Sequence, residues 1–296
     1  MTNHTKAIWQ ALLVTFLWST SWVLIKFGLG EIPPLLFAGL RYGLAALILL
    51  PWLLRPSGRR QLASLQRNDV LALVLLGLVM ITITQGAQFL ALAHLPAPTL
   101  SLMLSMSTPV IAFLGVLFLG ERLRGLQWMG IAVSIIGAFI YFGRLEAAPP
   151  LGLGIGALGV LATSVGAIQG RAFNRKTKLS ALTVTALSIG VGAAVLLALA
   201  FIYEPWPSLS GREVLIILWL AAVNTAFAFI LWNQTQRILP AAESGVINNT
   251  MLIQIAILAW VFLGERITLI QGIGLLLAAI GTALVQLKPK GSSAKA

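Results

Sequence analysis

Long apolar runs follow one another along the chain, separated by short segments in which Pro, Gly and charged residues gather. A helix needs about 20 mostly apolar residues to cross a bilayer, and punctuation of this kind marks helix ends. The pattern therefore predicts ten membrane-spanning helices, and their short connections leave no room for a soluble catalytic domain. The spans cover approximately residues 7–28, 33–54, 70–94, 96–119, 126–143, 151–170, 179–203, 213–237, 240–263 and 269–287.

One seven-residue motif occurs twice, as LFLGERL at 117–123 and as VFLGERI at 261–267, an offset of 144 positions. The repeat predicts two halves of five spans each, residues 1–145 and 146–296. Because five is odd, the second half enters the membrane from the opposite side, an inverted repeat typical of secondary transporters. Duplication in a non-transporting membrane scaffold is the alternative. The same offset aligns Pro96 with Pro240, Gly130 with Gly274, and Gly137 with Gly281.

Composition supports lipid as the solvent, because 58% of the 296 residues are hydrophobic and only 9% are charged. A soluble domain carries about 25% charged residues. The net charge is +12, and the basic residues lie between the apolar runs. This position indicates membrane orientation and lipid contact rather than nucleic-acid binding. Fifteen Lys and Arg lie on the side of both termini and four on the other, so both termini are predicted in the cytoplasm. The four are Lys26, Arg144, Arg212 and Arg266.

Four stretches carry a family resemblance, and they occur in order along nearly the whole chain. They are FLWSTSW (16–22), STPVIAFLGVLFLGERL (107–123), ILWNQTQRILPAAESGVINNT (230–250) and VFLGERI. The chain resembles EamA-type members of the drug/metabolite transporter superfamily, and most of all the bacterial amino-acid and metabolite exporters of the cell inner membrane. The resemblance implies an all-α fold, with spans 1–4 and 6–9 around a central cavity and spans 5 and 10 at the periphery.

Enzymatic chemistry has little support in the sequence, which lacks cysteine, a metal-ligand cluster and a phosphate-binding loop. We therefore expect no enzyme, no cofactor and no metal. Distant relatives by resemblance, the small multidrug exporters, use a glutamate in their first span, and span 1 here has none. Facilitated diffusion is the prediction, and proton-coupled antiport is the alternative.

Aromatic and amide side chains are the candidates for binding a solute. Trp18 lies ~16 Å along span 1, near mid-bilayer, where it forms a cavity wall that stacks on a solute or else packs on a small residue such as Gly166. Trp22 lies further out and is expected to help close the outer side. Buried amides either bind solute or join helices, and they suit the two ends of a zwitterion. The polar candidates are Thr84, Gln85, Gln88, Asn224, Asn248 and Asn249.

Four charged residues are candidates for gating. Arg41 lies ~12 Å inside span 2. It attracts a substrate carboxylate, closes an outer gate with Glu31, or else snorkels to the interface or binds helix carbonyls. Lys26 ends span 1. Glu243 begins span 9, where it complements the helix dipole or forms a cytoplasmic gate.

These features predict a transporter that exports small organic solutes, most plausibly amino acids or related metabolites, by alternating access. A sugar-phosphate or nucleotide-sugar exchanger would favour several inward-facing basic residues, and only Arg41 and Lys26 qualify. The internal duplication makes a monomer sufficient, with a homodimer as the alternative. Both FLGER copies are interpreted as structural corners, with Glu121-Arg122 facing the cytoplasm and Glu265-Arg266 facing outside.

Overall fold

The computed structural model describes residues 3–119, 123–142, 148–174, 177–235, 238–239 and 241–286. All regular elements of these residues are helical. The first half contains α1 (Asn3–Gly28), α2 (Pro34–Leu54), α3 (Pro56–Ala63), α4 (Arg67–Gly77), η1 (Leu78–Ile83), α5 (Thr84–His94), α6 (Ala97–Ser105), α7 (Ser107–Leu119) and α8 (Gly125–Phe142). The second half contains α9 (Pro150–Asn174), α10 (Ala181–Tyr203), α11 (Gly211–Ala221), η2 (Ala222–Phe227), α12 (Ala228–Thr235), α13 (Ala241–Leu263) and α14 (Leu269–Gln286).

The predicted ten-span, all-α architecture is confirmed. Nine helical segments of the described chain are long and apolar enough to cross a bilayer, and α14 contributes a shorter apolar helix, Leu269–Val285. Three spans are composite, because α4, η1 and α5 run on as span 3, α6 and α7 form span 4, and α11, η2 and α12 form span 8.

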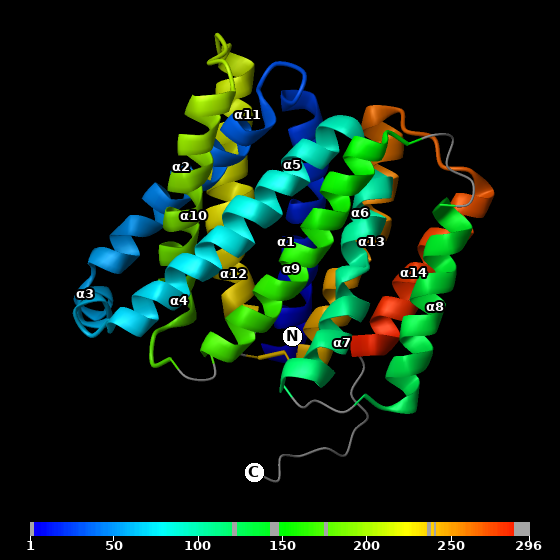
Figure 1. Cartoon of the computed structure of the whole chain (residues 1–296), viewed down its shortest axis with the longest axis horizontal. Helices are drawn as coiled ribbons and strands as arrows, with labels where there is room; N and C mark the ends of the chain where they lie inside the picture. The colour runs from blue at the N-terminus through cyan, green and yellow to red at the C-terminus, as the bar shows by residue number, and fades with distance from the viewer. Residues whose placement is uncertain are drawn as a thin grey trace.

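The two halves have opposite directions in the bundle. In Figure 1, α1 begins at the lower end and rises, whereas α9, the first helix of the second half, begins at the upper end and descends. The upper end, at which α1 ends and α2 begins, is hereafter the outer end, following the orientation that the loop charges predict. The opposite end is the inner end.

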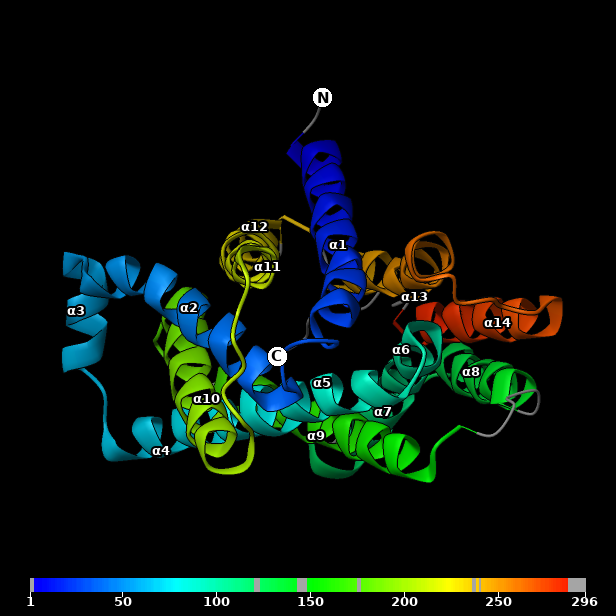
Figure 2. The ribbon, with the colours of Figure 1, turned by 90° about the horizontal axis from the view of Figure 1, so that it is seen from above.

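Helices α8 and α14 form a pair at one edge of the bundle (Figure 2), where the resemblance placed spans 5 and 10. Their glycines allow the two backbones to touch. A Cβ on Gly130 would lie 2.6 Å from the carbonyl oxygen of Gly281, and one on Gly137 would lie 2.6 Å from that of Gly274. The repeat offset relates Gly130 to Gly274 and Gly137 to Gly281. Each glycine therefore contacts the counterpart of the other glycine on its own helix, as expected for an antiparallel pair of repeated helices.

Three local features were not predicted from the apolar runs. A short helix, α3, follows Pro56 in the loop between spans 2 and 3. Span 4 breaks at Met106, because Pro109 lacks the N–H that would continue the hydrogen-bond ladder and its ring clashes with the preceding turn. Spans 3 and 8 each contain a π-helical segment, η1 and η2.

The main apolar core joins residues of spans 1–4 and 7–9, and four of its large side chains lie in the outer parts of spans 1, 2 and 3. Trp22, Ile25, Phe37 and Phe89, hereafter the outer plug, are all at most 6% exposed. The rings of Phe37 and Phe89 pack edge to face with centroids 5.3 Å apart. These four large side chains therefore fill space between spans 1, 2 and 3 near the outer end.

Candidate functional site

The two π-helical segments are related by the internal repeat, since both ends of η1 and η2 differ by 144 positions. In each region a threonine hydroxyl donates to the carbonyl oxygen five residues earlier. Thr84 donates to Val79 at 2.8 Å, and Thr225 donates to Leu220 at 2.8 Å. Such π-bulges interrupt a helix with one extra residue and are frequent at functional sites. Both halves therefore carry the same irregularity in the middle of a span.

Arg41 of α2 is only 5% exposed and lies against η2 and α1. Its Nε donates to the Thr225 hydroxyl at 3.0 Å, and its Nη2 reaches the Ser21 hydroxyl at 3.5 Å. Among the described residues, no carboxylate forms an ion pair with this guanidinium. Neutral hydroxyls offset only part of the cost of removing a charge from water. Arg41 is thus a buried positive charge that has no anionic partner among the described residues and that an anion would neutralise.

Asn224 of η2 is fully buried beside these residues. Arg41, Thr225, Ser21 and Asn224 are hereafter the polar cluster. The Nδ2 of Asn224 donates to the Leu17 carbonyl oxygen, to the Thr20 hydroxyl at 3.1 Å and to the Ser21 hydroxyl at 3.0 Å. Because Leu17 offers a carbonyl acceptor, the amide is oriented with its nitrogen toward α1. Its Oδ1 has no hydrogen-bond partner among the described residues. Ser21 therefore links Arg41 to an amide with a free acceptor.

Trp18 packs in an aromatic cluster rather than on Gly166, the small residue considered from the sequence. Its ring centroid lies 5.2 Å from that of Trp232 and 5.6 Å from that of Phe229, both on α12. Gly166 instead lies against the Met80 side chain. The Trp18 side chain is half-buried, so part of its ring stays accessible. The cluster is an aromatic surface three residues along α1 from Ser21.

Replacing Trp18 with Leu is expected to lower the affinity for aromatic or cationic solutes about tenfold while leaving small aliphatic solutes unaffected, because a stacking contact contributes about 0.5–1.5 kcal/mol. Competition by a series of solutes for uptake into proteoliposomes measures this. Trp9→Leu, an exposed Trp on the same helix, is the matched control. An equal loss for aliphatic and aromatic solutes would contradict a stacking role.

The other predicted residues of spans 1 and 3 lie in the following surroundings. Trp22 lies in the outer plug, consistent with closure of the outer side. Thr84 is buried and engaged with its own helix. Gln85 accepts a hydrogen bond at 2.6 Å from the hydroxyl of Tyr42, the neighbour of Arg41, so it joins span 3 to span 2. Gln88 is half-buried on the same helix.

On α13, Asn248 and Asn249 are half-buried, and Asn249 Nδ2 has no partner among the described residues. The polar group that ties α13 to α1 is Gln254, which sequence reasoning missed. Its Oε1 accepts from Ser19 at 2.9 Å, and its Nε2 donates to Thr250 at 2.9 Å. An amide within an apolar run was the signal that selected Asn224, and it would have selected Gln254 as well.

Of the alternatives that the sequence leaves open for Arg41, a contact with Glu31 is not formed in this structure. Glu31 is exposed in the turn between α1 and α2, whereas Arg41 is buried against Thr225 and Ser21. The packing of α1 and η2 against α2 turns the guanidinium away from the outer surface. The Glu243 side chain and the Glu121-Arg122 pair lie outside the described residues.

The second FLGER copy forms a cross-bundle contact at the outer end. Gly264 ends α13 with a φ of 68°, a left-handed conformation that favours glycine. Glu265 then accepts from the backbone N–H of Ala97 at 2.9 Å and pairs with Lys26 at 3.8 Å. Burial raises the pKa of Glu265, and the Lys26 charge partly offsets this rise.

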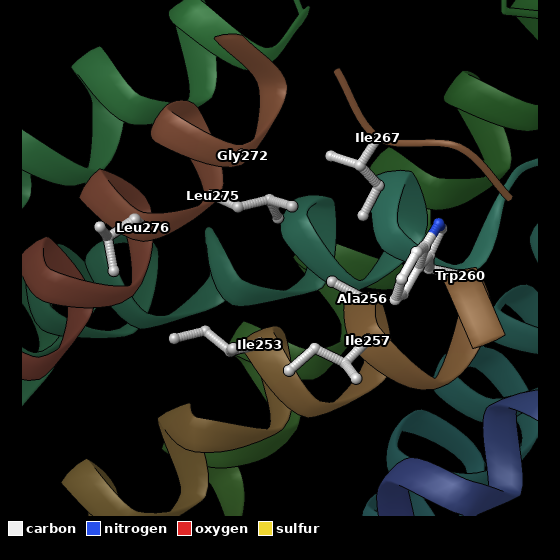
Figure 3. A pocket seen from close by; sticks show the side chains of 8 residues that line it. All are labelled: Ile253, Ala256, Ile257, Trp260, Ile267, Gly272, Leu275 and Leu276. Carbon is white, nitrogen blue, oxygen red and sulfur yellow. The ribbon is translucent and has the colours of Figure 1, made fainter. Parts of the chain in front are cut away.

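A separate pocket of about 420 Å³ lies between α13 and α14 (Figure 3). Its lining is apolar, as in Ile253, Ile267 and Leu276, apart from the indole N–H of Trp260. Ile253, Trp260 and Leu276 are exposed in the protein alone and, on membrane-spanning helices, meet lipid chains. This pocket has no group that would bind a charged solute, so the polar cluster around Arg41 is the stronger candidate site.

The chain is similar to known proteins along most of its length. A model of the EamA-like transporter family matches residues 5–143 and again residues 150–287. The chain belongs to this family. As an EamA-like transporter it is a multi-pass membrane protein, and the two matches cover its two five-span halves.

Two relatives and one solved structure show how far the likeness extends. A probable amino-acid metabolite efflux pump of Salmonella typhimurium is 30% identical, over 92% of this chain and 91% of the relative. An S-adenosylmethionine/S-adenosylhomocysteine transporter of Chlamydia trachomatis serovar L2 is 24% identical, over 88% of this chain and 82% of the relative. A crystal structure at 20% identity superposes with a TM-score of 0.67, over 95% of this chain and 97% of that one, and shares its fold.

Proposed function

We propose that this EamA-like transporter exports amino acids or related small metabolites that carry a carboxylate, by alternating access between its two halves. One observation carries the substrate class: Arg41 is buried and bonded to hydroxyls, and no carboxylate of the described residues pairs with it. A substrate carboxylate supplies the missing counter-charge, and Arg presents two parallel N–H donors that match its geometry. The name of the Salmonella relative supports the same class.

In this proposal three side chains bind different parts of the solute. Arg41 binds the carboxylate, the free Oδ1 of Asn224 accepts a hydrogen bond from the ammonium group, and Trp18 covers the side chain of the solute. A zwitterion thus satisfies a buried charge and a buried acceptor together, which favours it over an amine or a neutral solute. Thr84, Gln85, Gln88, Asn248 and Asn249 remain candidates for contacts to other parts of the solute.

S-adenosylmethionine is a second candidate substrate, because it carries an amino-acid end, a sulfonium and an adenine. The relative from Chlamydia trachomatis is named for this solute. The accessible part of the Trp18 ring offers a face for the adenine or the sulfonium, since cations and aromatic rings both bind to indole. The same Arg41 and Asn224 would hold its amino-acid end.

We also propose that transport is facilitative, that both termini face the cytoplasm of a bacterial inner membrane, and that one chain suffices. The halves, residues 1–145 and 146–296, move against each other around the polar cluster. The uncharged π-helical segments at the same place in each half give spans 3 and 8 a point at which to bend.

Uptake into proteoliposomes that contain only this protein tests the proposal. We expect saturable flux for at least one amino acid or for S-adenosylmethionine, with no flux in protein-free vesicles. Uphill accumulation driven by an imposed pH gradient alone would show proton coupling instead of facilitated diffusion. Absence of flux for every carboxylate-bearing solute, with flux for amines or sugars, would reject the substrate class.

A further inference from the structure

Two spans of the first half begin without a side-chain cap of their own at the outer end. The residues that precede α2 and α6 are Pro33 and Pro96, and neither offers a side-chain hydrogen bond to the first turn. The first N–H groups of a helix need acceptors, and inside a bundle water supplies few of them. Both helices obtain their acceptors from carboxylates of the second half.

Glu204, just after α10, accepts from Leu35 N at 3.0 Å and from Leu36 N at 2.7 Å at the start of α2. Glu265, just after α13, accepts from Ala97 N at 2.9 Å at the start of α6. A carboxylate at a helix N-terminus also meets the positive end of the helix dipole. Each contact therefore ties the end of a second-half span to the start of a first-half span.

Lys26 adds a third connection, because its Nζ lies 3.8 Å from the second oxygen of Glu265. One carboxylate thus binds the end of α1 and the start of α6 together. Both side chains are mostly buried, at 22% and 17% exposure, so salt and water screen the pair less than they would at a free surface. Two residues of the outer plug, Trp22 and Ile25, precede Lys26 on α1, on the side of the inner end.

The inner end carries a neutral version of one of these contacts. Ser180 N, at the start of α10, donates to the Gln61 amide oxygen at 2.7 Å. Ser180 is the repeat counterpart of Leu36, so Gln61 takes the place that Glu204 takes at the outer end. The counterpart of Lys26 is Gly170, which is uncharged. Charge-assisted bonds are about twice as strong as neutral ones, so the Glu204 contacts at the outer end are stronger than the Gln61 contact at the inner end. Glu121, the repeat counterpart of Glu265, lies outside the described residues.

We propose that Lys26, Glu204 and Glu265, with the N-termini of α2 and α6, form an outer lock that keeps the transport path closed to the outside at rest. The lock breaks when the halves rock and the ends of α10 and α13 leave the starts of α2 and α6. It rests on the proposed alternating access, and it makes the inner end the one that opens first. A resting state open to the cytoplasm suits an exporter, which must load its solute there.

The chain has no cysteine, so a single introduced thiol reports on the lock without background. Ala38 belongs to the same core cluster as the outer plug and is fully buried. In Ala38→Cys, a membrane-impermeant maleimide added outside right-side-out vesicles should label slowly. Adding Lys26→Met or Glu265→Gln should raise that labelling at least tenfold, normalised to labelling after denaturation. Glu265→Gln keeps a neutral acceptor for Ala97 N and so tests the ion pair.

The double variant Lys26→Met/Glu265→Gln should label no faster than the faster single variant, because both changes break one bond. Glu31→Gln, an exposed carboxylate at the same end, is the matched control and should leave labelling unchanged. Unchanged labelling in both lock variants, or an equal rise in Glu31→Gln, would overturn the proposal. The assay needs no substrate, so faster labelling with no amino-acid flux would reject the proposed function and leave the lock intact.

Discussion

Replacing Arg41 with Gln is expected to reduce uptake of carboxylate-bearing amino acids about a hundredfold, which corresponds to ~2.8 kcal/mol of binding free energy. Glutamine can replace a hydrogen bond but carries no charge, so the substrate carboxylate would be buried without a counter-ion. Initial rates of uptake into proteoliposomes measure the effect across a range of solute concentrations. The Arg41→Lys variant should recover only part of the activity, because an ammonium lacks the planar fork.

Stability separates this role from a structural one. Among the described residues the guanidinium contacts two hydroxyl groups and lies 5.2 Å from the centroid of the Tyr42 ring, without a carboxylate partner, so removing its charge relieves a desolvation cost. We therefore expect the thermal unfolding midpoint of Arg41→Gln in detergent to be no lower than that of the wild type. Arg59→Gln, on the exposed surface of α3, is the control for charge and should transport normally. A lower midpoint with normal transport would assign Arg41 to the fold.

Gly192→Ala is expected to destabilise the protein by about 1–3 kcal/mol, the usual cost of overpacking, although alanine favours helices. A Cβ at Gly192 would lie 2.4 Å from the Gly77 carbonyl oxygen and 2.4 Å from the Ile81 Cβ. Span 7 and span 3 touch there at the start of η1, and Thr82 also donates to the Gly192 carbonyl oxygen at 3.0 Å. The spans must separate to admit one methyl group, which displaces η1. Thermal unfolding in detergent measures the loss.

Gly190→Ala is the matched control on the same helix, because its Cβ would meet only the Ala46 Cβ at 3.9 Å. It should be neutral or stabilise the helix by up to about 1 kcal/mol. The two variants share chemistry, helix and depth and differ only in their neighbours. Equal stability of the two would show that the close approach of spans 3 and 7 is not required.

The spans and the repeat could be predicted from the sequence because their causes are local. Twenty apolar residues with punctuation specify a span wherever they occur, and the 144-residue offset can be counted directly. The π-helical segments could not be found in this way. One extra residue within an apolar run leaves the run unchanged in composition, and only the backbone structure of η1 and η2 reveals it.

The site could be predicted residue by residue only in part, because partners depend on packing between distant spans. The sequence singles out Arg41 as an unusual charge, but the partners it suggests are helix carbonyls, a substrate carboxylate or Glu31, and not Thr225 and Ser21. The second FLGER copy was interpreted as a corner, which its glycine supports. Its contact with Ala97 lies 168 positions away, and no local pattern encodes such a distance.

The most direct test of the central claim compares an amino acid that is transported with the amine left after its decarboxylation. Both are offered to proteoliposomes of the wild-type protein, at equal concentrations and without imposed gradients. We expect saturable uptake of the amino acid and at least about a hundredfold slower uptake of the amine, because only the amino acid offers Arg41 a carboxylate. Equal uptake of the two would contradict a carboxylate site at Arg41.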